Sequence, residues 1–264
     1  MNTDQLIDKA IQAALLAGSK IMEVYSSVDL EIEFKEDQSP ITKADRLAHD
    51  QIVETLKCTQ LPLLSEEGIH QPYAERKNWK LFWLIDPLDG TKEFIKRNND
   101  FTVNIALIRE NKAFAGVIYV PVSEEIYVGI SGIGAWKYQS PARDTTFSSI
   151  QNHGQKLPLQ TKYDEFVVMI SRSHRNTETE EKIEEYRKIH SDIRFISRGS
   201  SLKICMVAEG NADVYPRFGQ IMEWDTAAGH AIVKAAGKNI YHADEQTEVT
   251  YNKEDLHNPN FIVR

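Results

Sequence analysis

Three consecutive strand patterns joined by short polar turns constrain the fold of this chain most. They lie at residues 101–108 (FTVNIALI), 112–121 (KAFAGVIYVP) and 124–130 (EEIYVGI), and all are rich in β-branched and aromatic residues. Strands connected in this way pair with their neighbours in sequence, so the segment predicts an antiparallel meander that ends near residues 132–136.

Helical and extended patterns precede the meander. Residues 29–37 alternate like a strand, and residues 42–57 predict a helix. The first 18 residues predict an amphipathic helix, because apolar side chains recur at helical spacing at Leu6, Ile7, Ala10, Ile11, Ala14 and Leu15. After the meander, residues 140–162 are polar and lack periodicity, which predicts a linker or a long surface loop.

Strand and helix patterns alternate in the second half of the chain. Strands are expected at residues 166–171, 193–197, 212–216, 239–243 and 261–263, and helices at residues 176–189, 201–210 and 225–237. Such alternation predicts a layered α/β unit. The chain is therefore expected to be an α/β protein with an α+β subdomain at residues 1–155 and an α/β subdomain at residues 156–264.

Charge and cysteine content exclude several classes of protein. The chain has 264 residues, with 39 acidic and 31 basic side chains, so a broad nucleic-acid-binding surface is not expected. Cys58 and Cys205 lie outside any CxxC pattern, which favours free thiols in a reducing compartment. No apolar run reaches membrane-spanning length and no signal peptide is recognisable, so a cytoplasmic location is expected.

The segment WLIDPLDGTKEF at residues 83–94 carries the first chemical signal. One interpretation is a strand that ends in a turn, because Pro87 and the pair Asp89-Gly90 are typical of turns. The other interpretation is a metal site, since Asp86, Asp89 and the Leu88 carbonyl would supply the oxygen ligands that Mg²⁺ prefers. The Gly90 and Thr91 amides would then face an anion if residues 92–96 begin a helical turn.

Further acids stand where they could join that site. Glu66 and Glu67 follow another apolar run, Asp225 is expected to be the N-cap of the helix at residues 225–237, and Asp45 lies at the start of the helix at residues 42–57. Each also has an ordinary explanation as a surface acid, a cap or a partner of the helix dipole. The Ser-Ser-Leu-Lys start of the helix near residue 201 would suit an anion, or it is a simple serine cap.

Taken in order, Glu66-Glu67, the block from Asp86 to Thr91, and Trp224-Asp225 resemble the signature of the inositol monophosphatase superfamily of metal-dependent, lithium-sensitive phosphatases. The similarity spans residues 42–232. The flanking segments TKEFI, SRSH at 171–174 and GSSLKICMVAEGNADVYPR are similar to CysQ-type 3′(2′),5′-bisphosphate nucleotidases. The resemblance implies a layered αβαβα sandwich of the inositol monophosphatase and sugar phosphatase type.

The resemblance also implies the site residues. Two or three Mg²⁺ ions would be held by Glu66, Asp86, the Leu88 carbonyl, Asp89 and Asp225, mostly from the N-terminal subdomain. Asp45 and Thr91 would be the catalytic pair that activates the attacking water. Substrate contacts are expected at Glu66, Leu88, Asp89, Gly90, Thr91, Ser171, His174, Gly199, Lys203 and Asp225.

The activity implied is hydrolysis of the 3′-phosphate of adenosine 3′,5′-bisphosphate to AMP and phosphate, with 3′-phosphoadenylyl sulfate as a further substrate, in sulfur assimilation. Two alternatives remain: an inositol monophosphatase or other sugar-phosphate phosphatase, and a catalytically silent nucleotide-binding protein. The only partner expected is the small nucleotide. The resemblance leaves open a peripheral association with the inner membrane.

Overall fold

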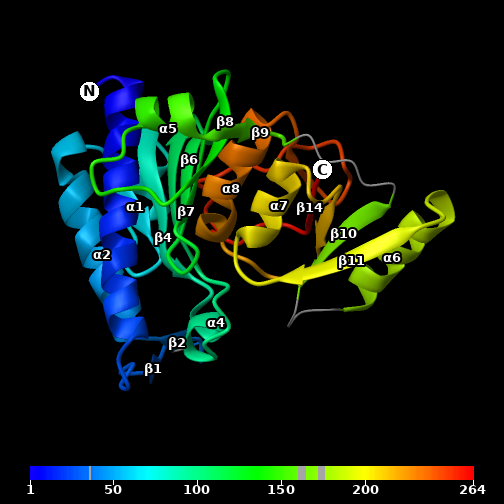
Figure 1. Cartoon of the computed structure of the whole chain (residues 1–264), viewed down its shortest axis with the longest axis horizontal. Coiled ribbons are helices and arrows are strands. Elements are labelled where there is room, and N and C mark those ends of the chain that lie inside the picture. The colour runs from blue at the N-terminus through cyan, green and yellow to red at the C-terminus, as the bar shows by residue number, and fades with distance from the viewer. Residues whose placement is uncertain (36, 160–164, 172–175) are drawn as a thin grey trace.

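A large mixed sheet forms the centre of the computed structural model, which describes residues 1–35, 37–159, 165–171 and 176–264 (Figure 1). Its strand order is β3-β4-β5-β6-β7-β8-β9, and only the β3–β4 pair is parallel. The strands are β3 (Leu63–Ser65), β4 (Leu81–Asp89), β5 (Thr102–Arg109), β6 (Lys112–Val120), β7 (Glu125–Ile130), β8 (Gly134–Gln139) and β9 (Gln155–Leu157). The predicted meander is confirmed, but its predicted end is wrong, because residues 134–139 add a fourth strand.

Helices cover both faces of this sheet. Figure 1 shows α1 (Thr3–Tyr25) and α2 (Lys43–Leu56) on one face and α8 (Glu223–Ala235) with α7 (Leu202–Glu209) on the other. The apolar stripe of α1 is buried along its length, as its spacing predicts. Helix α8 lies very close to the sheet at Gly116 and Gly129, which have no side chain. A Cβ atom at either position would overlap the backbone of α8.

A smaller layered unit follows on the far side of α7 and α8. Strands β10 (Phe166–Ser171) and β11 (Ile193–Arg198) pair in parallel, and β12 (Tyr215–Arg217), β14 (Phe261–Val263) and β13 (Ile240–His242) form an antiparallel sheet. A bridge between Val168 and Val214 joins the two sheets, and α6 (Thr177–Ile189) packs outside them. The layers therefore alternate helix, sheet, helix, sheet, helix, which confirms the predicted αβαβα sandwich.

Two local predictions are wrong. Residues 140–162 are not simply a loop, because they contain α5 (Phe147–His153) and β9; Phe147 and Ile150 are buried against the first sheet. Two buried apolar residues are too few to produce a visible period. Among residues 29–35 and 37, the strand is limited to β1 (Glu33–Phe34), which pairs with β2 (Pro40–Ile41). Phe34 is exposed in this two-stranded sheet.

Short elements complete the described residues: a 3₁₀ turn (Lys57–Thr59), α3 (Tyr73–Arg76) and α4 (Thr91–Ile95). Among all the helices of the described residues, none is both long enough and apolar enough to cross a bilayer. Cys58 is exposed and Cys205 is buried, and both are free thiols, as predicted. The division at residues 155 and 156 falls inside β9, and two separate subdomains remain a prediction.

Candidate active site

The parallel pairing of β3 and β4 brings the first two acids together. Ser65 stands opposite Ile85 in the register, and the Glu66 amide donates to the Ile85 carbonyl at 3.1 Å. Two parallel strands run in the same direction, so the residues that follow the Ser65–Ile85 pair lie beside each other. Glu66 and Asp86 are therefore adjacent although twenty positions separate them in sequence.

A bulge in β4 explains why its acids are three residues apart. Asp86 pairs with Asn104 and Asp89 with Thr102, so two residues of β4 oppose one residue of β5. An extra residue shifts the alternation of side chains by one, which lets positions 86 and 89 face the same side. Gly90 then turns the chain with a φ of 95° and begins α4, which confirms the expected helical turn.

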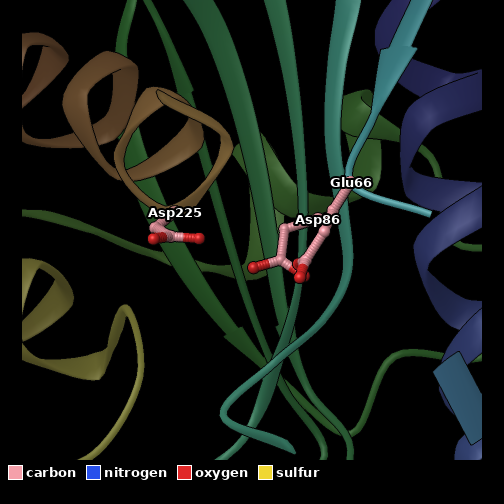
Figure 2. A group of neighbouring side chains, drawn as sticks. All are labelled: Glu66, Asp86 and Asp225. Atoms are coloured by element: carbon pink, nitrogen blue, oxygen red, sulfur yellow. The ribbon is translucent and has the colours of Figure 1, made fainter. Parts of the chain in front are cut away.

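The start of α8 delivers the acid from the second half of the chain. The prediction that Asp225 is the N-cap is wrong, because the helix begins at Glu223. Asp225 is the third residue of the helix, and its Oδ2 accepts a hydrogen bond from the Met222 amide at 2.9 Å. The sequence Glu-Trp-Asp allows this earlier start because an acid at the third position also satisfies a free amide. Figure 2 shows Asp225 facing Glu66 and Asp86, and ligand oxygens of the three lie within 4.8 Å of one another.

These acids repel one another, and burial shields them from solvent. Burial, together with the neighbouring negative charges, raises the pKa of Asp86 well above its usual range, and burial raises the pKa of Asp225 and Glu66 as well. The cluster is partly offset by Lys35, whose Nζ lies 2.8 Å from Glu66 and 2.6 Å from Glu67. Three converging carboxylates fit a hard divalent cation such as Mg²⁺.

Asp45 and Thr91 meet beside the cluster. The Thr91 hydroxyl lies 3.1 Å from Asp45 Oδ1 and 3.4 Å from the Leu88 carbonyl. The other carboxylate oxygen of Asp45 accepts the amide and hydroxyl of Thr42, at 2.7 and 2.6 Å, because Asp45 caps α2. Burial raises the pKa of Asp45 to about 6, despite these hydrogen bonds. Asp45 is thus a fixed acceptor for the Thr91 proton.

Asp89 faces the segment that links β11 to α7. Its Oδ2 accepts the Ser201 amide at 2.7 Å, the Ser201 hydroxyl at 2.6 Å and the Ser200 hydroxyl at 2.8 Å. Ser201 is the cap residue of α7 but makes no side-chain cap, so the serine-cap interpretation is wrong. Its hydroxyl donates a hydrogen bond to Asp89 instead.

A cavity of about 410 Å³ opens over these groups, and basic residues line it as well as acids. Lys203 and Arg217 line it and are almost fully buried. Burial lowers the pKa of Lys203 to about 8, and the buried Nε of Arg217 has no hydrogen-bond partner among the described residues. Neither cation forms a salt bridge with a carboxylate in the part of the chain that the structure describes, and buried cations of this kind are expected to bind an anion.

Most of the predicted site residues line this cavity. They are Glu66, Asp86, Leu88, Asp89, Gly90, Thr91, Ser171, Gly199, Lys203 and Asp225. Asp45 reaches it through Thr91. His174 lies outside the described residues.

Sequence analysis missed two groups of this site. In the sequence, Arg217 is either an additional positive charge for an anion or a solvated side chain, and Lys35 is one charge within the alternating residues 29–37. Only long-range contacts place them: Lys35 reaches Glu66 from the β1–β2 hairpin, and Arg217 lines the cavity from the second sheet.

Comparison with known proteins agrees with this geometry. The model of the inositol monophosphatase family matches residues 2–262. The chain belongs to the inositol monophosphatase family. The 3′(2′),5′-bisphosphate nucleotidase CysQ of Salmonella typhimurium is 42% identical over 98% of this chain and 99% of its own, and that of Escherichia coli K12 is 41% identical with the same coverage.

Solved structures of the family have the same fold. CysQ from Bacteroides thetaiotaomicron superposes with a TM-score of 0.92 at 49% identity, covering 99% of this chain and 97% of its own. The extragenic suppressor protein suhB from Bartonella henselae superposes with a TM-score of 0.73 at 24% identity, over 97% and 94% of the two chains. The second likeness concerns the fold alone.

Proposed function

We propose that this protein is a Mg²⁺-dependent 3′(2′),5′-bisphosphate nucleotidase that hydrolyses the 3′-phosphate of adenosine 3′,5′-bisphosphate to AMP and phosphate. Nucleotidases that carry this name are 41–42% identical over nearly the whole chain. The observation that carries the proposal is one cavity lined both by three converging acids and by the buried cations Lys203 and Arg217. A substrate with two phosphates would place one at metal ions held by the acids and the other at the cations.

The acids would hold the metal ions. We assign Glu66, Asp86, the Leu88 carbonyl, Asp89 and Asp225 as ligands for two or three Mg²⁺. When bound, these cations would offset the charge of the phosphate oxygens and lower the pKa of the attacking water.

The chain's own side chains would orient the reaction. Thr91 would accept a hydrogen bond from the attacking water while its own proton points to Asp45, which makes Asp45 the base of the pair. Lys203, Ser171, Gly199 and, outside the described residues, His174 would contact the nucleotide. Arg217 joins Lys203 at the phosphate that does not react.

A monophosphate substrate such as inositol 1-phosphate would need only the acidic side of the cavity. It would leave the buried Lys203 and Arg217 without an anion, which counts against the sugar-phosphate alternative. A silent binding protein would need no intact pair of Asp45 and Thr91, yet that hydrogen bond is present.

A substrate series tests the proposal. Initial rates with Mg²⁺ are measured for adenosine 3′,5′-bisphosphate, 3′-AMP, which lacks the second phosphate, and inositol 1-phosphate. We expect kcat/KM to fall in that order, with about a tenfold or greater loss from bisphosphate to 3′-AMP, as for one lost charged hydrogen bond. Preference for inositol 1-phosphate would favour the sugar-phosphate alternative, and no turnover would favour the silent one.

Lithium sensitivity is a second consequence. Li⁺ is similar in size to Mg²⁺ but carries half its charge, so it would occupy a weak site among Asp86, Asp89 and Asp225 without supporting charge on the leaving oxygen. Rates at fixed Mg²⁺ should fall much more in LiCl than in KCl at equal ionic strength, which excludes screening. The exposed Asp50→Asn should keep this sensitivity and Asp225→Asn should alter it. Equal rates in the two salts would contradict a lithium-sensitive site.

A further inference from the structure

A buried polar network lies behind Asp89, on the strand next to it. Thr102 and Asn104 are fully buried on β5, and they are the cross-strand partners of Asp89 and Asp86. Neither side chain lines the cavity. Polar side chains are costly at such positions unless every group has a partner, and here the partners lead to Asp89.

Asn104 orients the hydroxyl of Ser201. Its Nδ2 lies 2.6 Å from Ser201 Oγ and 3.4 Å from Asp89 Oδ2, and its Oδ1 lies 2.9 Å from the Thr102 hydroxyl. Because Nδ2 donates to Ser201 Oγ, the single hydroxyl hydrogen of Ser201 is left for Asp89, 2.6 Å away. The opposite amide orientation would draw that hydrogen to Asn104 and leave two bare oxygens facing each other. The Asp225 carbonyl, at 3.4 Å, is a weaker alternative acceptor.

Thr102 completes the other branch. Its hydroxyl lies 2.7 Å from Ser200 Oγ, which lies 2.8 Å from Asp89 Oδ2. The single hydroxyl hydrogen of Thr102 goes to Asn104 Oδ1, which fixes the amide orientation that serves Ser201. Thr102 Oγ is then an acceptor, so the Ser200 hydrogen is shared between Asp89 Oδ2 and Thr102 Oγ. Ser200 has a φ of 53°, in the left-handed region that side chains avoid, so the fold holds it in this position at some cost.

Both branches end on one oxygen atom. With the Ser201 amide, Asp89 Oδ2 faces four donors, which exceeds its lone pairs and leaves it no capacity for a cation. We propose that Asn104 and Thr102 are positioning residues of the reaction. Thr102 fixes the Asn104 amide, and Asn104 acts through Ser201 to hold Asp89 so that only its Oδ1 is presented to the metal. This rests on the proposed function, in which Asp89 is a metal ligand.

Metal binding without substrate tests the proposal directly. The probe is Mn²⁺, with the free ion measured by electron paramagnetic resonance in the presence of the full chain. Asn104→Leu and Thr102→Val keep side-chain volume but remove the hydrogen bonds. We expect each to weaken Mn²⁺ binding about tenfold or more, as for other residues that orient a metal ligand. Thr102→Ser keeps the hydroxyl and should bind nearly as the parent chain does.

The control is Ile105→Val, a buried change on the same strand that leaves the network intact. It is expected to lower the Tm slightly, because a buried methyl group is lost, but it should leave Mn²⁺ affinity unchanged. In steady-state assays, the Mg²⁺ concentration for half-maximal rate should rise in Asn104→Leu and Thr102→Val, whereas KM for the nucleotide at saturating Mg²⁺ should change little.

The outcomes separate this proposal from the function. If both polar variants bind Mn²⁺ as the parent chain does, even with a lower Tm, Asn104 and Thr102 have only a structural role and the proposal is overturned. A parent chain that binds Mn²⁺ but does not hydrolyse the bisphosphate overturns the function and leaves the positioning effect measurable. A parent chain that binds no Mn²⁺ overturns both.

Discussion

At the residue scale, the two oxygens of Asp89 have different tasks. Oδ2 is occupied by hydrogen-bond donors from the Ser200–Ser201 segment, and in the proposed site Oδ1 would bind the metal. An amide cannot replace a carboxylate here, because one of its two ends is a donor.

Asp89→Asn should therefore lose most turnover while the fold remains. Its NH₂ group would face either the donors at Ser201 or the metal, and both are unfavourable. We expect kcat/KM to fall about 100-fold or more, at the upper end of effects at metal sites. Circular dichroism and steady-state rates at saturating Mg²⁺ check this. Asp50→Asn, at an exposed position, is the matched control; near-parental activity of Asp89→Asn would contradict the metal assignment.

Lys203 should control the binding of the second phosphate. Lys203→Ala is expected to raise KM for adenosine 3′,5′-bisphosphate more than it lowers kcat, because a phosphate that does not react is held equally before and during the reaction. Lys203→Met keeps the aliphatic stem against Tyr215 and removes only the charge. Both should raise KM about tenfold or more, while rates with 3′-AMP change less. An unchanged KM would remove Lys203 from the substrate site.

The lowered pKa of Lys203 gives the same residue a pH signature. Burial holds that pKa at about 8, so the ammonium is charged below pH 8 and neutral above it. The kcat/KM of the parent chain, which reports groups of the free enzyme, should fall as pH rises through about 8. Lys203→Met should lack this step.

At the element scale, α8 serves both the site and the core. Its first turn carries Asp225, and its middle packs on the first sheet through the close contacts at Gly116 and Gly129. His230, fully buried on the same helix, donates from Nε2 to Asn239 Oδ1 at 2.6 Å, which leaves Nδ1 to accept from the Tyr251 hydroxyl at 2.8 Å. The imidazole is thus satisfied in its neutral form.

Acid should weaken this part of the core. Burial lowers the pKa of His230 from 6.5 to about 4, so the unfolded chain binds the proton first. The stabilisation is complete above pH 6.5 and is lost as pH falls toward 4, by roughly 3 kcal/mol in total. Urea unfolding at several pH values measures the free energy of unfolding as a function of pH. Between pH 4 and 6.5 this free energy should change less with pH in His230→Gln than in the parent chain. The control His153→Gln, at an exposed position, should show the same pH dependence as the parent chain. Equal pH dependence for the parent chain and both variants would contradict the lowered pKa of His230.

At the scale of the whole molecule, the acidic cluster of the proposed metal site joins distant parts of the chain. Glu66 and Asp86 come from the first sheet, whereas Asp225 comes from the second half of the sequence. A cation between them would cross-link these parts in the folded state only.

Mg²⁺ should therefore raise the Tm. At 100 times the dissociation constant the gain is about 2.7 kcal/mol, or roughly 5–10 °C for a chain of this size. Differential scanning calorimetry with MgCl₂, against KCl at equal ionic strength, measures it. Asp225→Asn should lose most of the gain and Asp50→Asn should keep it. A Tm that does not respond to Mg²⁺ would argue against a metal held across these elements.

The sequence alone determined the elements and the acids. The amphipathic first helix, the meander and the alternating second half follow from periodicity, because local burial repeats at 3.6 or 2 residues. The order of Glu66, the block from Asp86 to Thr91, and Asp225 predicted a ligand set through its resemblance to a known family, and three of these acids, Glu66, Asp86 and Asp225, lie together in the structure. Where the periodicity was too short, as in α5, or the alternation was not buried, as around β1, prediction failed.

Only the tertiary structure decided how these residues work together. The parallel β3–β4 pair set Glu66 beside Asp86, the β4 bulge aligned Asp89 with Thr102, and the second half of the chain brought Ser200 and Ser201 onto Asp89. In sequence, Asn104 reads as one polar residue in a strand, and Arg217 as one more charge. Their roles depend on contacts between residues far apart in the chain, which no local pattern encodes, because the partner of a buried polar group is fixed only when the layers pack.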